Sequence, residues 1–474
     1  MKGGIDMLFA SAGFLFAFFP LFMLMFAIVP DRAKKVAVLI GSVAFYVLAN
    51  IYNPFSILIL WLAVLLHYFA ALLLRRFHDR FLLILLIAVD MMALFSLRLL
   101  CNQLLEQYYF TFPVGASIYF LMGISYLIDC YRNPAPQADD LMKTAMYLSF
   151  FPVLLAGPLI RFHDFREYAE HFSFRMDNFA RGARVMTLGL VKCMGVGAVL
   201  AEAYDNILLY SEMQVNVTIG ILSLAMMYLI VFFFFSGYSD MGAGICIMLG
   251  MPVDRDYRYP LTATSPMAYL KGFFHSFYEF FKVYVTDPLE RCKFGSPYLR
   301  RVIGLVIYVL SLTLWFRVSP NVLWVACPLL LAVLVETIPP VGRFFRCRFG
   351  KICGWLLTFI STVVYWAMFQ WGSYDEFRTY LGTLLEVSGS YQSLYTYATS
   401  IGFDFIIVGV IALVILMPLS SRRDPVGEHI SAKVRPLVEV LVSLLLIVLL
   451  VLTLVYFLPQ FPQYATAPYA YFVI

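Results

Sequence analysis

Two polar features inside long apolar segments carry the residue types best suited to chemistry. The first is the run SGYSD, from Ser236 to Asp240, which follows four consecutive phenylalanines. A carboxylate at membrane depth costs about 3 kcal/mol or more unless it is paired or hydrated. Asp240 therefore predicts a protein-lined or water-filled interior, and we expect the neighbouring glycines and serines to loosen the helix.

The second feature is His275, in the aromatic-rich segment SPMAYLKGFFHSFYEFF. Imidazole titrates near neutrality, so histidine is the usual general base where a hydroxyl must lose its proton. If the segment is one helix, Lys271 and Glu279 lie one turn before and after His275. A packing role is the simpler explanation for a buried histidine. His67, the other histidine in a strongly apolar segment, has no charged neighbour in the sequence and is interpreted as structural.

The composition indicates what kind of protein positions these residues. The chain has 474 residues, of which 62% are hydrophobic and 13% charged. Such a composition is typical of a polytopic membrane protein, and apolar runs of about 20 residues can cross a hydrocarbon core of about 30 Å as helices. We therefore predict an all-α fold in one domain. The eight cysteines include no CxxC pair, so no disulfide framework or bound metal is expected. No bound cofactor is expected either.

Placing the Lys- and Arg-rich loops on the cytoplasmic side gives about a dozen crossings with both termini outside. The first apolar run is too long for a signal-peptide core and is predicted to remain as a helix. The crossings with the clearest limits are predicted at Met7–Val29, Pro54–Leu74, Pro113–Cys130, Val185–Leu200, Val302–Trp315, Val322–Thr337, Ile352–Phe369, Phe403–Met417 and Leu437–Phe457.

Two apolar segments are bounded by basic residues on both sides and are predicted to be re-entrant. One is Met142–Ile160, in which the sequence Ala-Gly-Pro at 156–158 offers a break in the helix. The other is the segment that contains His275, which would place this histidine inside the protein. Between Arg161 and Arg184 we expect a surface amphipathic segment, with a solvated loop as the open alternative.

Several motifs occur along the chain in the order found in one known family. They are FPVGASIYFLMGISYLIDCYRNP (112–134), YLSFFPVLLAGPLIRFHDF (147–165), FSGYSDM (235–241), YWAMFQWGSYDEFRTYLGTLL (365–385) and the closing PYAYFVI. Through them the chain resembles the membrane-bound O-acyltransferases (MBOAT). It is most similar to the bacterial branch that includes the alginate O-acetyltransferase and the D-alanyl transferase of teichoic acids.

The resemblance implies a helical core with re-entrant segments around a central funnel, in the plasma or inner membrane. It implies transfer of an acyl group from a cytoplasmic thioester, acyl-CoA or an acyl carrier protein, to an extracytoplasmic hydroxyl of a cell-surface glycan or polymer, as in O-acetylation of a cell-envelope polysaccharide. The implied partners are membrane lipid, the thioester donor and an extracytoplasmic acyltransferase or esterase-like protein. Nucleic acid is not among them.

Transferred residue by residue, the resemblance places His275 at the family's first histidine, as a candidate base or positioning residue. The second histidine, to which the family's catalytic role is generally assigned in the motif LWHG, is replaced here by Phe316. An arginine common in the family is absent near Gln370. The residues expected to line the funnel or contact substrate are Ser236, Tyr238, Ser239, Asp240, Lys271, Tyr278, Glu279 and Trp315.

Three further residues, Asp129, Arg132 and Arg161, are candidates for contact with the donor or its carrier. A helix-terminal ion pair or snorkelling to the interface explains them equally. Because Phe316 can neither take nor hold a proton, two other function classes stay open: an inactive relative that serves partner proteins as a scaffold or conduit, and a transporter whose broken helix carries the run at 236–240.

Overall fold

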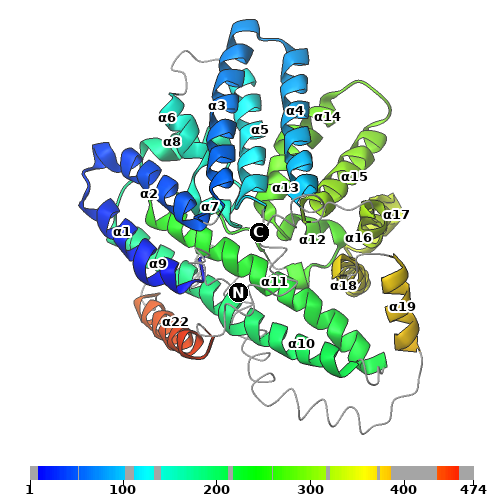
Figure 1. Ribbon diagram of the computed structural model, residues 1–474. Helices are drawn as coiled ribbons and strands as arrows, with labels where there is room; N and C mark the ends of the chain where they lie inside the picture. The colour runs from blue at the N-terminus through cyan, green and yellow to red at the C-terminus, as the bar shows by residue number, and fades with distance from the viewer. Residues whose placement is uncertain are drawn as a thin grey trace. The chain divides into compact units, whose positions relative to one another are not determined.

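The computed structural model describes residues 9–51, 53–101, 112–132, 140–211, 217–258, 260–316, 321–370, 374–385 and 435–457. Every regular element in these residues is a helix (Figure 1), which confirms the all-α prediction. Seven helices among them are long and apolar enough to span a membrane, and three more apolar helices are shorter. The chain is therefore a multi-pass membrane protein. The expected crossing at Phe403–Met417 and the PYAYFVI motif lie outside the described residues, and the sidedness of the loops stays a prediction.

The chain forms two compact units, which are described separately. The first comprises the residues up to Met186 together with Tyr238–Asp254, and the second comprises Thr187–Gly237 together with the residues from Arg255 onward. A single domain stays a prediction from the sequence.

The first unit is built around α5 (Ala116–Arg132), which packs against α3 (Pro54–Phe77) and α4 (Arg80–Leu99), as Figure 1 shows. All but three residues of α5 are buried, as expected for a helix that is apolar on every side. The outer faces of α3 and α4 expose large aliphatic side chains that suit lipid. The N-terminal end of α4 is capped by Asp79, whose carboxylate accepts the N–H groups of Phe81 and Leu82.

The first predicted re-entrant segment consists of two short helices, α6 (Leu141–Leu148) and α7 (Phe151–Leu154). At a rise of about 1.5 Å per residue neither can cross the hydrocarbon core. Residues 155–161 then continue without helix to α8 (Phe162–Glu170). The structure thus breaks this segment twice, once at Ser149–Phe150 and once near the expected Ala-Gly-Pro. Helices α1 (Phe19–Ile28), α2 (Lys34–Ala49) and most of α9 (Met176–Leu190) complete the unit.

In the second unit, α16 (Val322–Thr337) packs against α15 (Pro297–Phe316) and α18 (Arg348–Gln370). The segment that contains His275 forms the short helices α12 (Pro266–Gly272), α13 (His275–Phe281) and α14 (Asp287–Arg291). The remaining helices are α10 (Ala198–Ser211), α17 (Pro339–Phe344), α19 (Tyr374–Leu385) and α22 (Arg435–Phe457). Helix α11 (Val217–Met248) contributes residues to both units.

Candidate functional site

The helix is interrupted between α12 and α13, directly before His275. Lys271 is thus on α12 while His275 and Glu279 are on α13, and the expectation that all three share one helix is wrong. Gly272 gives one reason, because a Cβ at this position would lie 2.4 Å from the carbonyl oxygen of Arg258. The backbone at Arg258 lies close to the end of α12, since the Arg258 N–H also donates to the Gly272 oxygen at 2.7 Å.

The second cause of the break is Phe274, which has a left-handed backbone (φ 57°, ψ 61°). For a residue with a Cβ this conformation costs about 1–2 kcal/mol. The buried ring offsets the cost by stacking on Phe277 at 5.2 Å and on Tyr257 at 6.4 Å, measured between ring centroids. Backbone strain of this kind concentrates at functional sites, and here it lies next to the candidate base.

Asp256 fixes the start of α13. Its main-chain oxygen accepts the His275 N–H at 2.8 Å, and its carboxylate accepts the Ser276 N–H at 2.7 Å. The residue is only 1% exposed. A carboxylate at a helix N-terminus satisfies unpaired N–H groups and interacts favourably with the helix dipole. No local pattern predicts this contact, because Asp256 precedes α13 by 19 residues.

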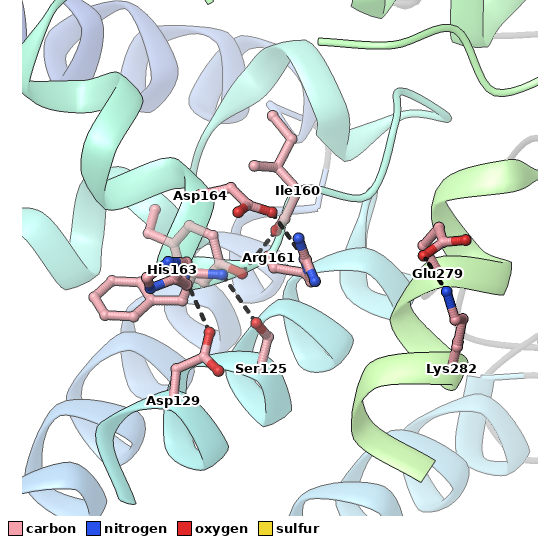
Figure 2. Close-up of polar contacts among 10 residues, drawn as sticks. Ser125, Asp129, Ile160, Arg161, His163, Asp164, Glu279 and Lys282 are labelled. Carbon is pink, nitrogen blue, oxygen red and sulfur yellow. Dashed lines mark hydrogen bonds and ion pairs between the residues drawn. The ribbon is translucent and has the colours of Figure 1, made fainter. Parts of the chain in front are cut away.

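The tautomer of His275 follows from its contact with α12. Nδ1 lies 3.0 Å from the main-chain oxygen of Lys271, which can only accept, so Nδ1 carries the proton. In the neutral imidazole Nε2 then holds the lone pair, as a general base requires. The side chain is half-buried, as is that of Tyr278 one turn later. Glu279 is paired at 3.6 Å with Lys282, the residue that follows the last residue of α13 (Figure 2).

Phe316, at the position of the missing histidine, lies in an aromatic cluster of the second unit. Its ring centroid is 4.9 Å from that of Phe235, 5.0 Å from Trp366 and 6.2 Å from Phe369, and the residue is 9% exposed. The adjacent Trp315 contacts Phe277, 5.6 Å between centroids, and so lines the His275 segment. Phe316 is therefore packed against at least three other aromatic rings.

The SGYSD run lies inside α11, which continues unbroken through it. The expected loosening is therefore wrong, and the transport alternative loses the broken helix on which it rested. Gly237 instead permits close helix packing, since a Cβ there would lie 2.7 Å from the oxygen of Gly189. Ser236, Tyr238, Ser239 and Asp240 are each no more than 1% exposed. Asp240 is thus surrounded by protein, while a funnel along these residues stays a prediction.

Asp129 takes part in an N-terminal cap in the first unit. Its carboxylate accepts the N–H of His163 at 3.0 Å, and Ser125, one turn earlier on α5, accepts the N–H of Phe162 at 2.9 Å (Figure 2). Both N–H groups belong to the first turn of α8 and need partners outside the helix. Asp129 lies near the end of α5, as predicted, and its carboxylate there connects α5 to the start of α8.

Arg161 precedes α8 beside this cap, and its Nε lies 2.8 Å from Asp164 (Figure 2). The Tyr147 hydroxyl donates to the Ile160 oxygen at 2.8 Å and holds the same turn. The structure thus brings both Asp129 and Arg161 to the N-terminal end of α8. Arg132, at the end of α5, is exposed. Contact of any of them with a donor stays a prediction.

His67 does have a charged neighbour, contrary to the expectation from sequence. Nε2 of His67 on α3 lies 3.1 Å from the Asp90 carboxylate on α4, and Nδ1 lies 2.7 Å from the oxygen of Ala63. Gly123 of α5 makes room, because a Cβ there would lie 2.0 Å from His67 Nε2. The sequence could not pair two residues on different helices. In the described part of the chain, no group of three or more His, Cys, Asp or Glu side chains could hold a metal ion.

Comparison with known proteins gives a consistent result. The model of the family described as MBOAT, membrane-bound O-acyltransferase family, matches residues 132–301. A protein named "Probable alginate O-acetylase AlgI" from Pseudomonas aeruginosa is 25% identical over 391 residues, which cover 77% of this chain and 72% of the relative. Its namesake from Azotobacter vinelandii is 25% identical and covers 77% and 75%. The "Peptidoglycan O-acetyltransferase" of Helicobacter pylori is 24% identical over 418 residues, 77% of each chain.

The matched region contains both the SGYSD run and His275, and it ends before Phe316. The relatives extend the similarity over about three quarters of the chain. The chain is thus similar to the membrane-bound O-acyltransferase family over residues 132–301, and to the alginate O-acetylases and the peptidoglycan O-acetyltransferase over about three quarters of its length.

Proposed function

We propose that the protein transfers an acyl group from an activated thioester on the cytoplasmic side to a hydroxyl of a cell-surface glycan or polymer, in the plasma or inner membrane. The observation that carries the proposal is the arrangement at His275. Its backbone is fixed by Asp256, its tautomer by the Lys271 oxygen, and its side chain is half-exposed. The names of the relatives, which refer to alginate and peptidoglycan, support a polymeric acceptor.

In the proposed reaction, Nε2 of His275 takes the proton of the acceptor hydroxyl while the oxygen of that hydroxyl attacks the thioester carbonyl. The tetrahedral oxyanion collapses to the ester and releases the thiolate, which then receives the proton from His275 and leaves as a thiol. A positioned base contributes about 10²–10⁴-fold to such a step. Tyr278, three residues after His275 on α13, is our candidate hydrogen-bond donor to the oxyanion.

The donor side of the proposal involves the turn at α8. Thioester carriers bear phosphate groups, and Arg161 and Arg132 supply guanidinium groups that bind phosphate in a planar, two-pronged geometry. Asp129 would act indirectly, by capping α8 and so fixing the turn that carries Arg161.

One observation favours a second candidate function, that of an inactive relative serving an extracytoplasmic acyltransferase or esterase-like partner as scaffold or conduit. Phe316 occupies the position of the family's second histidine and is packed among aromatic rings. If that histidine were indispensable, this site could not transfer an acyl group.

Label transfer in reconstituted membranes tests the proposal. The wild type is supplied with a labelled acyl thioester and a polymer carrying free hydroxyls, and is compared with His275→Ala. His171→Ala, which removes an exposed histidine at the end of α8, is the matched control. We expect transfer from the wild type and the control, and loss of about 10²-fold or more in His275→Ala. Equal transfer from all three proteins would refute the role of His275.

A further inference from the structure

Two turns of the second unit share a five-residue pattern. Arg-Cys-Lys-Phe-Gly occupies 291–295, just before α15, and Arg-Cys-Arg-Phe-Gly occupies 346–350, at the start of α18. The turns lie at the same end of the helix pair α15 and α16, because the Tyr298 hydroxyl near the start of α15 lies 3.1 Å from Thr337 Oγ1 at the end of α16. We call residues 291–301 and 338–351 the basic aromatic surface.

The basic aromatic surface carries a concentrated positive charge. Its two ranges contain eight basic residues and no acidic residue. All are exposed except Arg300, which is partly buried. Among the residues that the structure describes, no carboxylate forms a salt bridge with any of them. The eight are Arg291, Lys293, Arg300, Arg301, Arg343, Arg346, Arg348 and Lys351.

Large apolar side chains are interleaved with these charges. Phe294 is 45% exposed, Tyr298 51%, Phe344 43% and Phe349 67%. The turns that present them are held in place: Arg300 donates to the Phe294 oxygen at 3.0 Å, and Gly350 N–H donates to the sulfur of Cys347 at 3.3 Å. Rings and cations are therefore displayed together on ordered turns.

We propose that the basic aromatic surface binds anionic phospholipids, with the cations on the headgroup phosphate and the exposed rings beside the upper acyl chains. Charge complementarity favours an anionic ligand. The exposed rings favour lipid over an acidic protein, because aromatic side chains are stable at the membrane interface, and helices α15 and α18, which begin at these turns, are long enough to span a membrane. The inference does not depend on acyl transfer.

Lipid preference can be measured on the full chain in phosphatidylcholine vesicles by quenching of tryptophan fluorescence with brominated phosphatidylglycerol or brominated phosphatidylcholine. Trp355, 37% exposed on α18 two turns beyond Arg348, is the nearby reporter. We expect the wild type to prefer phosphatidylglycerol about fivefold, the effect of one cationic contact with an anionic surface. A Trp355→Phe variant identifies the share of the quenching that arises at this site.

The test variant combines Arg291→Gln, Lys293→Gln, Arg346→Gln and Arg348→Gln, and should lose the preference. Its matched control removes the same charge elsewhere, by Arg76→Gln, Arg80→Gln, Arg166→Gln and Arg175→Gln, all exposed in the first unit, and should keep it. Exchange of the three arginines of the turns for lysine should also keep it.

Three results would overturn the proposal. One is a wild type without preference for phosphatidylglycerol. Another is an equal loss in the test variant and the charge-matched control, which would indicate a response to net charge alone. The third is binding of soluble polyglutamate that the turn substitutions abolish while lipid preference is unchanged, which would assign the surface to an acidic protein.

Discussion

Substitution of Asp256 tests the capping of α13 and its effect on His275. Asp256→Ala removes the carboxylate that accepts the Ser276 N–H at 2.7 Å, whereas the main-chain bond to His275 is kept. Loss of an N-terminal cap costs about 1 kcal/mol, with a range of about 0.5–2 kcal/mol. Asp256→Asn keeps an oxygen acceptor at the same place, so its cost should be smaller.

The effect on the reaction should exceed the effect on stability. His275 is the first residue of α13. Without the cap, the first turn of α13 is held less firmly, and the imidazole can move relative to the Lys271 oxygen. A displacement of about 1 Å can cost about 100-fold in rate. We therefore expect transfer to fall about 10- to 100-fold in Asp256→Ala, and about threefold or less in Asp256→Asn.

The assay combines transfer from a labelled thioester in vesicles with thermal unfolding of the same proteins in detergent. Both variants should remain folded at the assay temperature, so that a lower rate reports on the site. A wild-type rate in Asp256→Ala would refute the positioning role. So would an Asn variant as slow as the Ala variant, because the oxygen acceptor would then be irrelevant.

Two more predictions concern contacts in the first unit. Asp90→Leu should lower the free energy of unfolding by about 1–3 kcal/mol, because it leaves His67 buried without its partner. The double substitution His67→Leu with Asp90→Leu should cost less than the sum of the two single substitutions. Additive losses in this double-mutant cycle would contradict the pairing. Hydrogen bonds from Lys35 and Lys143 hold the pKa of Glu170 in the folded protein below its usual value of 4.5. The ionised carboxylate therefore stabilises the folded protein fully above pH 4.5, and this stabilisation is lost as the pH falls through the lower pKa of the folded state. The melting temperature of the wild type should therefore exceed that of Glu170→Gln at pH 7, and the two should converge below pH 4.5; a gap that does not depend on pH would contradict the assignment.

The helices could be predicted from the sequence because apolar length is a local signal. The limits expected for the helix at Val322–Thr337 are those of α16, and the crossing at Pro54–Leu74 differs from α3 by three residues at one end. The glycines near Asp240 were misinterpreted because the same residue that loosens an isolated helix also permits close packing.

The arrangement at His275 could not be predicted, because its causes lie far away in the chain. The segment from Pro266 to Phe281 has the composition of one continuous helix. Its break depends on the carbonyl of Arg258, and the start of α13 depends on the carboxylate of Asp256. His275 itself was found as a rare residue type in an apolar segment, but its tautomer required the structure.

Under our proposal, this site transfers acyl groups with His275 and without the family's second histidine. Label transfer from the wild type, His275→Ala and Phe316→His is the decisive measurement. We predict transfer from the wild type, a loss of about 10²-fold or more in His275→Ala, and no gain in Phe316→His, where an imidazole would replace a ring packed among aromatic side chains. Transfer from Phe316→His alone, with an inactive wild type, would contradict the claim and indicate a family fold whose chemistry is switched off at that position.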